Sequence, residues 1–148
     1  MTPDEQQRLQ RLMARHAAML VLLGLATGAF AGLAMSQKVD ADGHAALASH
    51  LNALLGAFWV LGVAWSVPLL RYSEPGARRL ALVIIGAQYA NWLVTLVKSL
   101  WRVSGIDFGG GARNEIVFVA LMLTVVLPSL AGAVAWLLGL RARGSPAA

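Results

Sequence analysis

Four apolar stretches, each long enough to cross a lipid bilayer, constrain this 148-residue chain more than any other feature. A helix needs about 20 apolar residues to span the hydrocarbon core, and backbone groups inside lipid must pair with one another because no water reaches them. Apolar residues make up 58% of the chain and charged residues 13%, against about 45–50% and 25% in soluble domains. We therefore predict an all-α fold, a four-helix transmembrane bundle with antiparallel neighbours, in one domain over residues 1–148. The predicted spans cover about residues 17–35, 50–70, 80–101 and 115–140.

Basic residues flank the apolar stretches and form no continuous patch, so the net charge of +5 reflects membrane topology and not a nucleic-acid partner. Cytoplasmic loops carry the excess of Lys and Arg, and eight of these residues fall on the side of the two termini against four on the other side. Both termini are therefore predicted to be cytoplasmic, in the lipid bilayer of a bacterial inner membrane. The eight are Arg8, Arg11, Arg15, Arg71, Arg78, Arg79, Arg141 and Arg143, and the four are Lys38, Lys98, Arg102 and Arg113.

The first helix has a start signal at the beginning of the chain. Thr2 and Glu5 have the spacing of a capping box, with Pro3 at the first helical position. Polar and apolar residues then alternate at helical period over residues 3–16, which predicts a short amphipathic segment on the membrane surface that leads into the first span. The tail from Arg141 is polar, and we predict that it is disordered.

The first loop, residues 36–49, contains Asp40, Asp42 and His44. A calcium-binding loop requires later ligands and a terminal glutamate, which this segment lacks. The chain has no cysteine, which excludes thiolate metal sites and disulfides. We therefore predict no metal site, and we expect Asp42 to cap the second helix, with His44 in its exposed first turn.

Gly24, Gly28 and Gly32 repeat at steps of four and lie on one face of the first span. Small residues allow helices to approach closely in membranes. This face is predicted to pack either inside the chain's own bundle or against a second copy in a homo-oligomer.

The third span carries polar residues at steps of three and four, which puts them all on one side of a helix. Lipid does not tolerate such a side, so it is predicted to face other helices or a wet cavity. Lys98 could instead extend to the membrane interface, and Gln88 and Asn91 could form hydrogen bonds between helices. The polar residues are Gln88, Asn91, Thr95, Lys98 and Arg102.

Residues of three spans share one depth under the predicted topology. Polar groups lie at the outer ends, and two tryptophans lie about 13 Å deeper. We therefore predict a cavity that opens outward, with a polar mouth and an aromatic floor. Glu115 could instead be a first-turn acid stabilised by the helix dipole, with Asn114 as the cap, and the tryptophans could be core residues. The polar groups are His50, Asn52, Lys98, Asn114 and Glu115, and the tryptophans are Trp59 and Trp92.

Pro128 in the fourth span leaves the carbonyl of Thr124 without its usual donor. One predicted outcome is a kink that widens the bundle. The other is a local adjustment of the helix.

A likeness to a known family lies in Leu47-Ala48-Ser49-His50-Leu51, in Gly56, Gly62 and Trp65, in Ala90-Asn91-Trp92, and in the hydropathy pattern over about residues 17–140. In these features the chain resembles the hydroxylaminobenzene mutase family, small membrane proteins that convert aryl hydroxylamines to ortho-aminophenols. The resemblance implies an isomerase that acts on a small aromatic substrate and needs no redox cofactor, and we expect no cofactor.

The rearrangement that this resemblance implies needs a proton donor to the leaving hydroxyl and groups that hold an electron-poor ring. His50 or Glu115 is the expected donor, and Lys98 would hold Glu115 or the departing hydroxyl. Amide side chains would orient the N–OH group, and tryptophans would stack on the ring. The expected substrate-binding residues are Asn52, Trp59, Gln88, Asn91, Trp92, Thr95 and Phe118.

A small membrane transporter or binding protein for aromatic or cationic compounds is the main alternative. Such carriers usually need a carboxylate deep within a span, whereas every acid here lies in a loop or near a terminus of a span. A haem or quinone protein with paired axial histidines is disfavoured because His16 and His50 lie toward opposite sides of the membrane. A scaffold that binds a partner helix through its glycine face is the remaining alternative.

Overall fold

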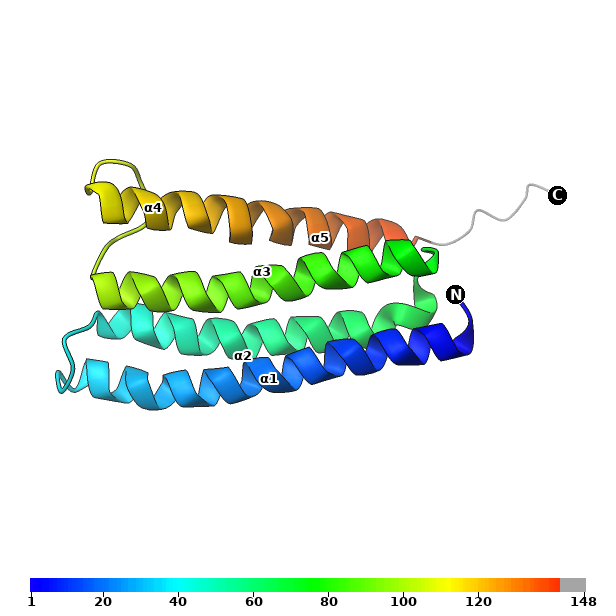
Figure 1. Ribbon diagram of the computed structural model, residues 1–148, viewed down its shortest axis with the longest axis horizontal. Helices are drawn as coiled ribbons and strands as arrows, with labels where there is room; N and C mark the ends of the chain where they lie inside the picture. Colours follow the sequence, from blue (N-terminus) through cyan, green and yellow to red (C-terminus); the bar gives the residue numbers. More distant parts are fainter. Residues whose placement is uncertain (142–148) are drawn as a thin grey trace.

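The computed structural model of the protein describes residues 1–141, which form four long helices joined by short loops (Figure 1). The all-α prediction is confirmed, and each of the four is long and apolar enough to cross a membrane. Of the tail predicted to be disordered, Arg141 is described and residues 142–148 lie outside the described residues. The helices are α1 (Pro3–Met35), α2 (Gly43–Ser66) with the 3₁₀ turn η1 (Val67–Leu69), α3 (Glu74–Trp101), and a fourth made of α4 (Ala112–Ala120), the π-helical turn η2 (Leu121–Val126) and α5 (Leu127–Gly139).

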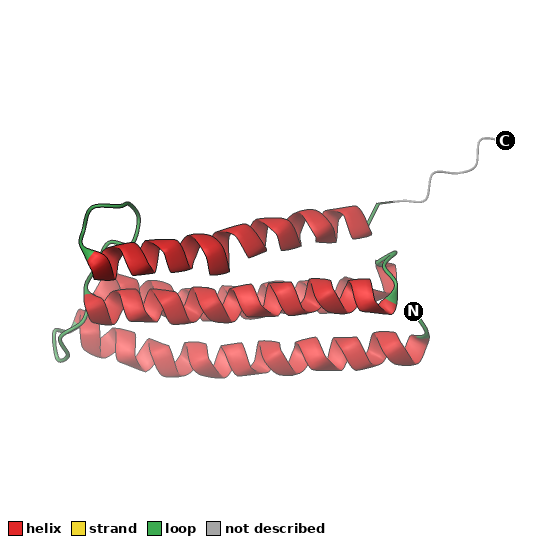
Figure 2. Ribbon diagram, turned by 45° about the horizontal axis from the view of Figure 1, so that its top comes forward, coloured by secondary structure: helices red, strands yellow, loops and turns green. Residues whose placement is uncertain are grey.

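Helices that follow one another in the sequence run antiparallel, so α1 and α3 begin at the end of the molecule where α5 ends (Figure 1). α1, α2 and α3 share a core in which Met13, Leu20, Val60 and Ile84 are fully buried. The fourth helix packs mainly on α3, lies apart from α1 (Figure 2), and is the least buried of the four. The orientation of the termini relative to the membrane stays a prediction.

The first helix begins at the predicted capping box. Thr2 Oγ1 accepts a hydrogen bond from the Glu5 amide at 3.3 Å, and the Glu5 carboxylate accepts one from the Thr2 amide at 2.6 Å. The helix then continues without a break to Met35. Leu9 and Met13 are buried in the core shared with α2 and α3. The prediction that this segment lies on the membrane surface is therefore corrected, because the segment packs as part of the bundle.

The second helix begins before His50 because Asp42 caps it. The Asp42 carboxylate accepts a hydrogen bond from the Ala45 amide at 3.0 Å, as predicted, and His44 is exposed in the first turn. The predicted span began at His50, whereas the helix begins at Gly43. His50 therefore lies about 10 Å along the helix from its first residue, well inside a segment long enough to cross the membrane.

The glycine face of α1 packs inside the bundle at two of its three positions. A Cβ at Gly24 would lie 2.8 Å from a methyl group of Leu54, and a Cβ at Gly28 would lie 2.8 Å from Nδ1 of His50. Gly32 has open space where a side chain would be. Close contact between α1 and α2 thus accounts for Gly24 and Gly28, while the homo-oligomer stays a prediction.

The fourth helix changes its hydrogen-bonding pattern just before Pro128. Residues 121–126 form a π-helical turn, a rare local widening of an α-helix. Pro128 has no amide hydrogen to give to the backbone carbonyl of Thr124. The side-chain hydroxyl of Thr124 donates to the Ala120 carbonyl at 2.7 Å. Of the two outcomes predicted for Pro128, the structure shows the local adjustment of the helix: the π-helical turn ends at Val126 and the α-helix resumes at Leu127. Val125 is buried within the turn, and the buried residues on either side of it include Val117, Gly132 and Gly139.

Candidate functional site

His50 is held between α1 and α2 by a backbone carbonyl. Its Nδ1 lies 2.7 Å from the carbonyl oxygen of Gly24, and because a carbonyl only accepts hydrogen bonds, Nδ1 carries the proton. Gly28 gives the ring its space, since a Cβ there would lie 2.8 Å from Nδ1 and 2.9 Å from Cε1. The side chain is half-buried, and Nε2 makes no hydrogen bond within residues 1–141.

A histidine fixed in this way presents Nε2 for chemistry. A neutral ring accepts a proton at Nε2, and a protonated ring donates one from it. A carbonyl on Nδ1 also orients histidines that ligate metals through the other ring nitrogen, so His50 is suited to hold a metal-containing cofactor as a single ligand. Residues 1–141 contain no group of three or more His, Cys, Asp or Glu side chains that would hold a metal ion by itself.

A second polar cluster lies between α2 and α3 and contains predicted substrate-binding residues. The Asn52 Nδ2 group donates to Asn91 Oδ1 and to Thr95 Oγ1, both at 3.1 Å. Nearby, the Ser49 hydroxyl donates to the backbone carbonyl of Trp92 at 2.9 Å. Both hydrogens of the Asn52 amide are used, and among the described residues the cluster's unused hydrogen-bonding atoms are Asn52 Oδ1, Asn91 Nδ2 and the hydroxyl hydrogen of Thr95.

The polar side of α3 faces α2, as expected for a side that lipid does not tolerate. Gln88 and Thr95 are buried, and Gln88 packs on Gly56 of α2, where a Cβ would lie 2.9 Å from Oε1 of Gln88. Arg102 departs from this pattern because it ends the helix in a left-handed conformation with φ 54°. Its guanidinium pairs with Asp40 of the first loop.

Trp92 links α3 to α1 near the level of His50. Its indole Nε1 donates to the Thr27 hydroxyl at 2.8 Å, and Thr27 precedes Gly28, the residue that packs on His50. Thr27 and Ser49 hold the indole and the backbone of Trp92, and neither was among the predicted site residues. Ser49 stands in the segment that carries the family resemblance. A lone hydroxyl in an apolar span belongs to no periodic pattern, so no signal in the sequence predicted the contact of either residue with Trp92.

The structure does not bring His50 and Asn52 into one pocket. His50 contacts α1 and Asn52 contacts α3, because residues two apart lie about 200° apart around a helix. Trp59 is half-buried against the core and lies seven residues from Asn52, on the same side of α2. The expectation of one outward-facing cavity is therefore corrected, since the polar groups form separate sites on different sides of α2.

Glu115 and Phe118 lie on the fourth helix, away from both polar sites. Glu115 is exposed and lines a cavity of about 540 Å³ together with Phe108 and Thr124. Phe118 meets Phe108 edge to face, with the ring centroids 4.5 Å apart. Lys98 is half-buried on α3 and forms no salt bridge within residues 1–141. The prediction that Lys98 holds Glu115 is therefore corrected, because no ion pair joins the two side chains.

Glu115 stabilises the beginning of α4. It lies in the first turn of that helix, where the helix dipole favours negative charge. Asn114 is buried and does not cap the helix, which follows Gly111. The Asn114 side chain instead accepts from the Gly105 amide at 2.6 Å and donates to the Asp107 carbonyl at 2.7 Å, so it holds the preceding loop.

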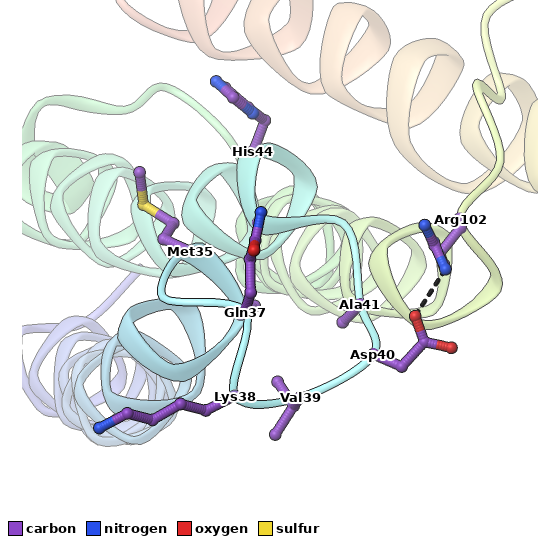
Figure 3. A pocket seen from close by; sticks show the side chains of 10 residues that line it. Met35, Gln37, Lys38, Val39, Asp40, Ala41, His44 and Arg102 are labelled. Carbon is purple, nitrogen blue, oxygen red and sulfur yellow. Dashed lines mark hydrogen bonds and ion pairs between the residues drawn. The ribbon is translucent and has the colours of Figure 1, made fainter.

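The first loop forms a polar cavity of about 530 Å³ (Figure 3). Asp40 pairs with Arg102, and the side chain of His44 points away from that pair (Figure 3). Asp42 caps α2. The three side chains that raised the question of a metal site therefore do not converge.

The Asn52 cluster predicts a measurable loss of stability. In Asn52→Ala, Asn91 Oδ1 and Thr95 Oγ1 lose their donor, and hydrogen bonds between membrane helices contribute about 0.6–2 kcal/mol. We expect a decrease of that size in the free energy of unfolding, measured by titration with SDS in mixed micelles. Leu51→Ala, which truncates an exposed neighbour, is the matched control. Equal stability of the two variants would contradict a supporting role for Asn52.

Two comparisons with known proteins show which proteins this chain is similar to. Residues 9–141 match the family model described as styrene oxide isomerase. Hydroxylaminobenzene mutase HabB of Ectopseudomonas oleovorans is 31% identical over 105 residues, which are 70% of this chain and 60% of that protein. The match thus spans less than two thirds of the relative's length, and it confirms the predicted resemblance to the hydroxylaminobenzene mutases. Because the family model covers nearly the whole chain, the protein belongs to the styrene oxide isomerase family of membrane isomerases.

Proposed function

We propose that this protein is a membrane isomerase that converts aryl hydroxylamines to ortho-aminophenols. A relative with 31% identity is named for a hydroxylaminobenzene mutase. The observation that carries the proposal is the placement of His50, whose Nδ1 bonds the Gly24 carbonyl at 2.7 Å and whose Nε2 makes no hydrogen bond within residues 1–141. An ionisable side chain inside a membrane-crossing helix is costly, and such residues usually mark functional sites.

One residue that first gives and then takes a proton accounts for this reaction. The protonated His50 ring gives its Nε2 proton to the hydroxyl oxygen, and the N–O bond breaks with its electron pair on oxygen, which leaves as water. That water forms a C–O bond at the ortho carbon and returns a proton to the neutral His50 ring. Transfer of the ortho hydrogen to nitrogen restores the aromatic ring. Substrate and product are isomers, so the reaction consumes no oxidant or reductant.

The hydrogen bonds around α2 support this placement of His50. Asn52 fixes α2 against Asn91 and Thr95 of α3, and the bond from Trp92 to Thr27 fixes α3 against α1. Catalytic groups need such support because they must be held within about 0.5 Å of the productive geometry. The proposed mechanism assigns no role to Lys98, Glu115 or Phe118.

The family model favours aryl epoxides as a second candidate substrate class, because it is named for styrene oxide isomerase. In that isomerisation the C–O bond beside the aromatic ring breaks, and a hydride shift from the neighbouring carbon gives the isomeric carbonyl compound. Both reactions break a bond to oxygen next to an aromatic ring and spread positive charge over that ring. A group that acts on the departing oxygen, the role given to His50, serves either reaction.

A product assay with the purified protein in detergent and no added cofactor tests the proposal. Phenylhydroxylamine is expected to give 2-aminophenol, and a parallel incubation with styrene oxide measures the second candidate. Liquid chromatography resolves the products of both. Isomerisation of the epoxide alone would replace the first candidate by the second. No product above a buffer blank from either substrate would contradict the proposed function.

A further inference from the structure

A charged cavity lies between the beginnings of α1 and α3, at the end of the bundle where the chain begins. Its volume is about 210 Å³, and its floor is apolar because Leu9 is buried and Leu12 half-buried beneath it. Two arginines and two glutamates surround this floor. The lining residues are Glu5, Arg8, Leu9, Leu12, Glu74 and Arg78.

Arg8 and Arg78 approach the cavity from different helices, α1 and α3. Both are exposed, and neither forms a salt bridge within residues 1–141. Glu5 is already engaged, because its carboxylate accepts the hydrogen bond from the Thr2 amide that caps α1. A guanidinium group binds a phosphate through two parallel hydrogen bonds. The cavity therefore offers two phosphate-binding groups above an apolar floor.

The position of the cavity points to a lipid as the source of the phosphate. α1 and α3 are both long and apolar enough to cross a membrane, and the polar headgroups of a bilayer surround the ends of such helices. The charge of this end favours an anionic headgroup, since seven arginines stand there against three acids among the described residues. The arginines are Arg8, Arg11, Arg15, Arg71, Arg78, Arg79 and Arg141, and the acids are Asp4, Glu5 and Glu74.

We propose that this cavity binds an anionic phospholipid of the phosphatidylglycerol type. The phosphodiester lies between Arg8 and Arg78, and the glycerol hydroxyls donate hydrogen bonds to the carboxylate of Glu74. The glycerol backbone and the first carbons of the acyl chains cover Leu9 and Leu12. The bound lipid joins α1 to α3 at an end where Glu5 and Glu74 alone would repel each other, and this role is independent of the proposed reaction.

Thermal unfolding of the purified protein in detergent tests the proposal. Phosphatidylglycerol is expected to raise the Tm in proportion to the logarithm of its concentration above the dissociation constant, whereas phosphatidylcholine, whose headgroup is neutral overall and has no hydroxyls for Glu74, is expected to raise it less. The double variant Arg8→Gln/Arg78→Gln should lose the response to phosphatidylglycerol. Arg11→Gln/Arg79→Gln removes the same charge from the same two helices without touching the cavity, and should keep the response.

Three results would overturn the proposal. Equal responses of the native protein to the two lipids would show that the anionic headgroup is not recognised. Equal loss of response in both double variants would show a general attraction between charges. The same rise in Tm with inorganic phosphate alone would show a site for a free anion. Each readout is independent of substrate turnover, so failure here leaves the proposed function untouched.

Discussion

Replacing His50 with alanine is expected to lower the rate of isomerisation by about 10²- to 10⁴-fold, the usual contribution of a general acid or base. The change removes Nε2, the atom that exchanges the proton in the proposed mechanism. The fold should persist, because the lost partner of Nδ1 is the backbone carbonyl of Gly24, which lies within the continuous helix α1. Initial rates of product formation, measured with whichever substrate the product assay identifies, give the comparison.

A second histidine in the same helix provides the matched control for this variant. His44 is exposed in the first turn of α2, and His44→Ala should keep the rate of the native protein. A similar loss in both variants would trace the effect to the helix and not to the ring at residue 50. Full activity in His50→Ala would remove His50 from the mechanism while leaving the family assignment intact.

Adding a single methyl group at Gly28 is expected to reduce the rate on the order of 10²-fold, the loss that displacing a catalytic group by about 1 Å can cause. The new Cβ would lie 2.8 Å from Nδ1 and 2.9 Å from Cε1 of His50, so the ring must move away from the Gly24 carbonyl. Overpacking of this kind also costs about 1–3 kcal/mol of stability. Gly28→Ala should therefore lower kcat. Thermal unfolding should show a lower Tm, with the variant still folded under the conditions of the rate assay.

One turn further along α1, Gly32 serves as the control for Gly28→Ala. A Cβ at Gly32 meets open space, and alanine favours a helix over glycine by about 1 kcal/mol. Gly32→Ala should keep the rate of the native protein and should not lower its stability. If Gly28→Ala kept the full rate as well, the contact between Gly28 and His50 would not set the position of the ring.

Much of the fold could be predicted because its causes are local in the sequence. Long apolar stretches force helices in lipid, and Thr2 with Glu5 and Asp42 carry the capping signals that the structure uses. The start of α2 was misplaced because hydropathy marks where a stretch becomes apolar, whereas the cap marks where the helix begins. The helix begins at Gly43, directly after its cap Asp42, whereas hydropathy placed its start at His50.

The candidate site was harder to predict because its contacts join different helices. The steps along α3 correctly placed Gln88 and Thr95 on a side that faces other helices. The partner of His50 is a carbonyl of Gly24, and a backbone group carries no signal in the sequence. His50 and Glu115 were grouped because the predicted topology puts them at the same depth in the membrane. Depth does not determine which side of a helix a side chain is on, and the two residues lie apart.

The π-helical turn of the fourth helix makes this span tolerant of a change in length. Val117 and Val125 are eight residues apart, whereas Val125, Gly132 and Gly139 follow at steps of seven. Steps of seven keep buried residues on one side of a helix, and an eighth residue would rotate them by about 100°. The wider turn takes up the eighth residue, so both halves keep their buried side toward the bundle. Deletion of one residue within 121–126 should remove the π-helical turn and keep the buried residues on the same side of the helix, while the carbonyl four residues before Pro128 still lacks its usual donor.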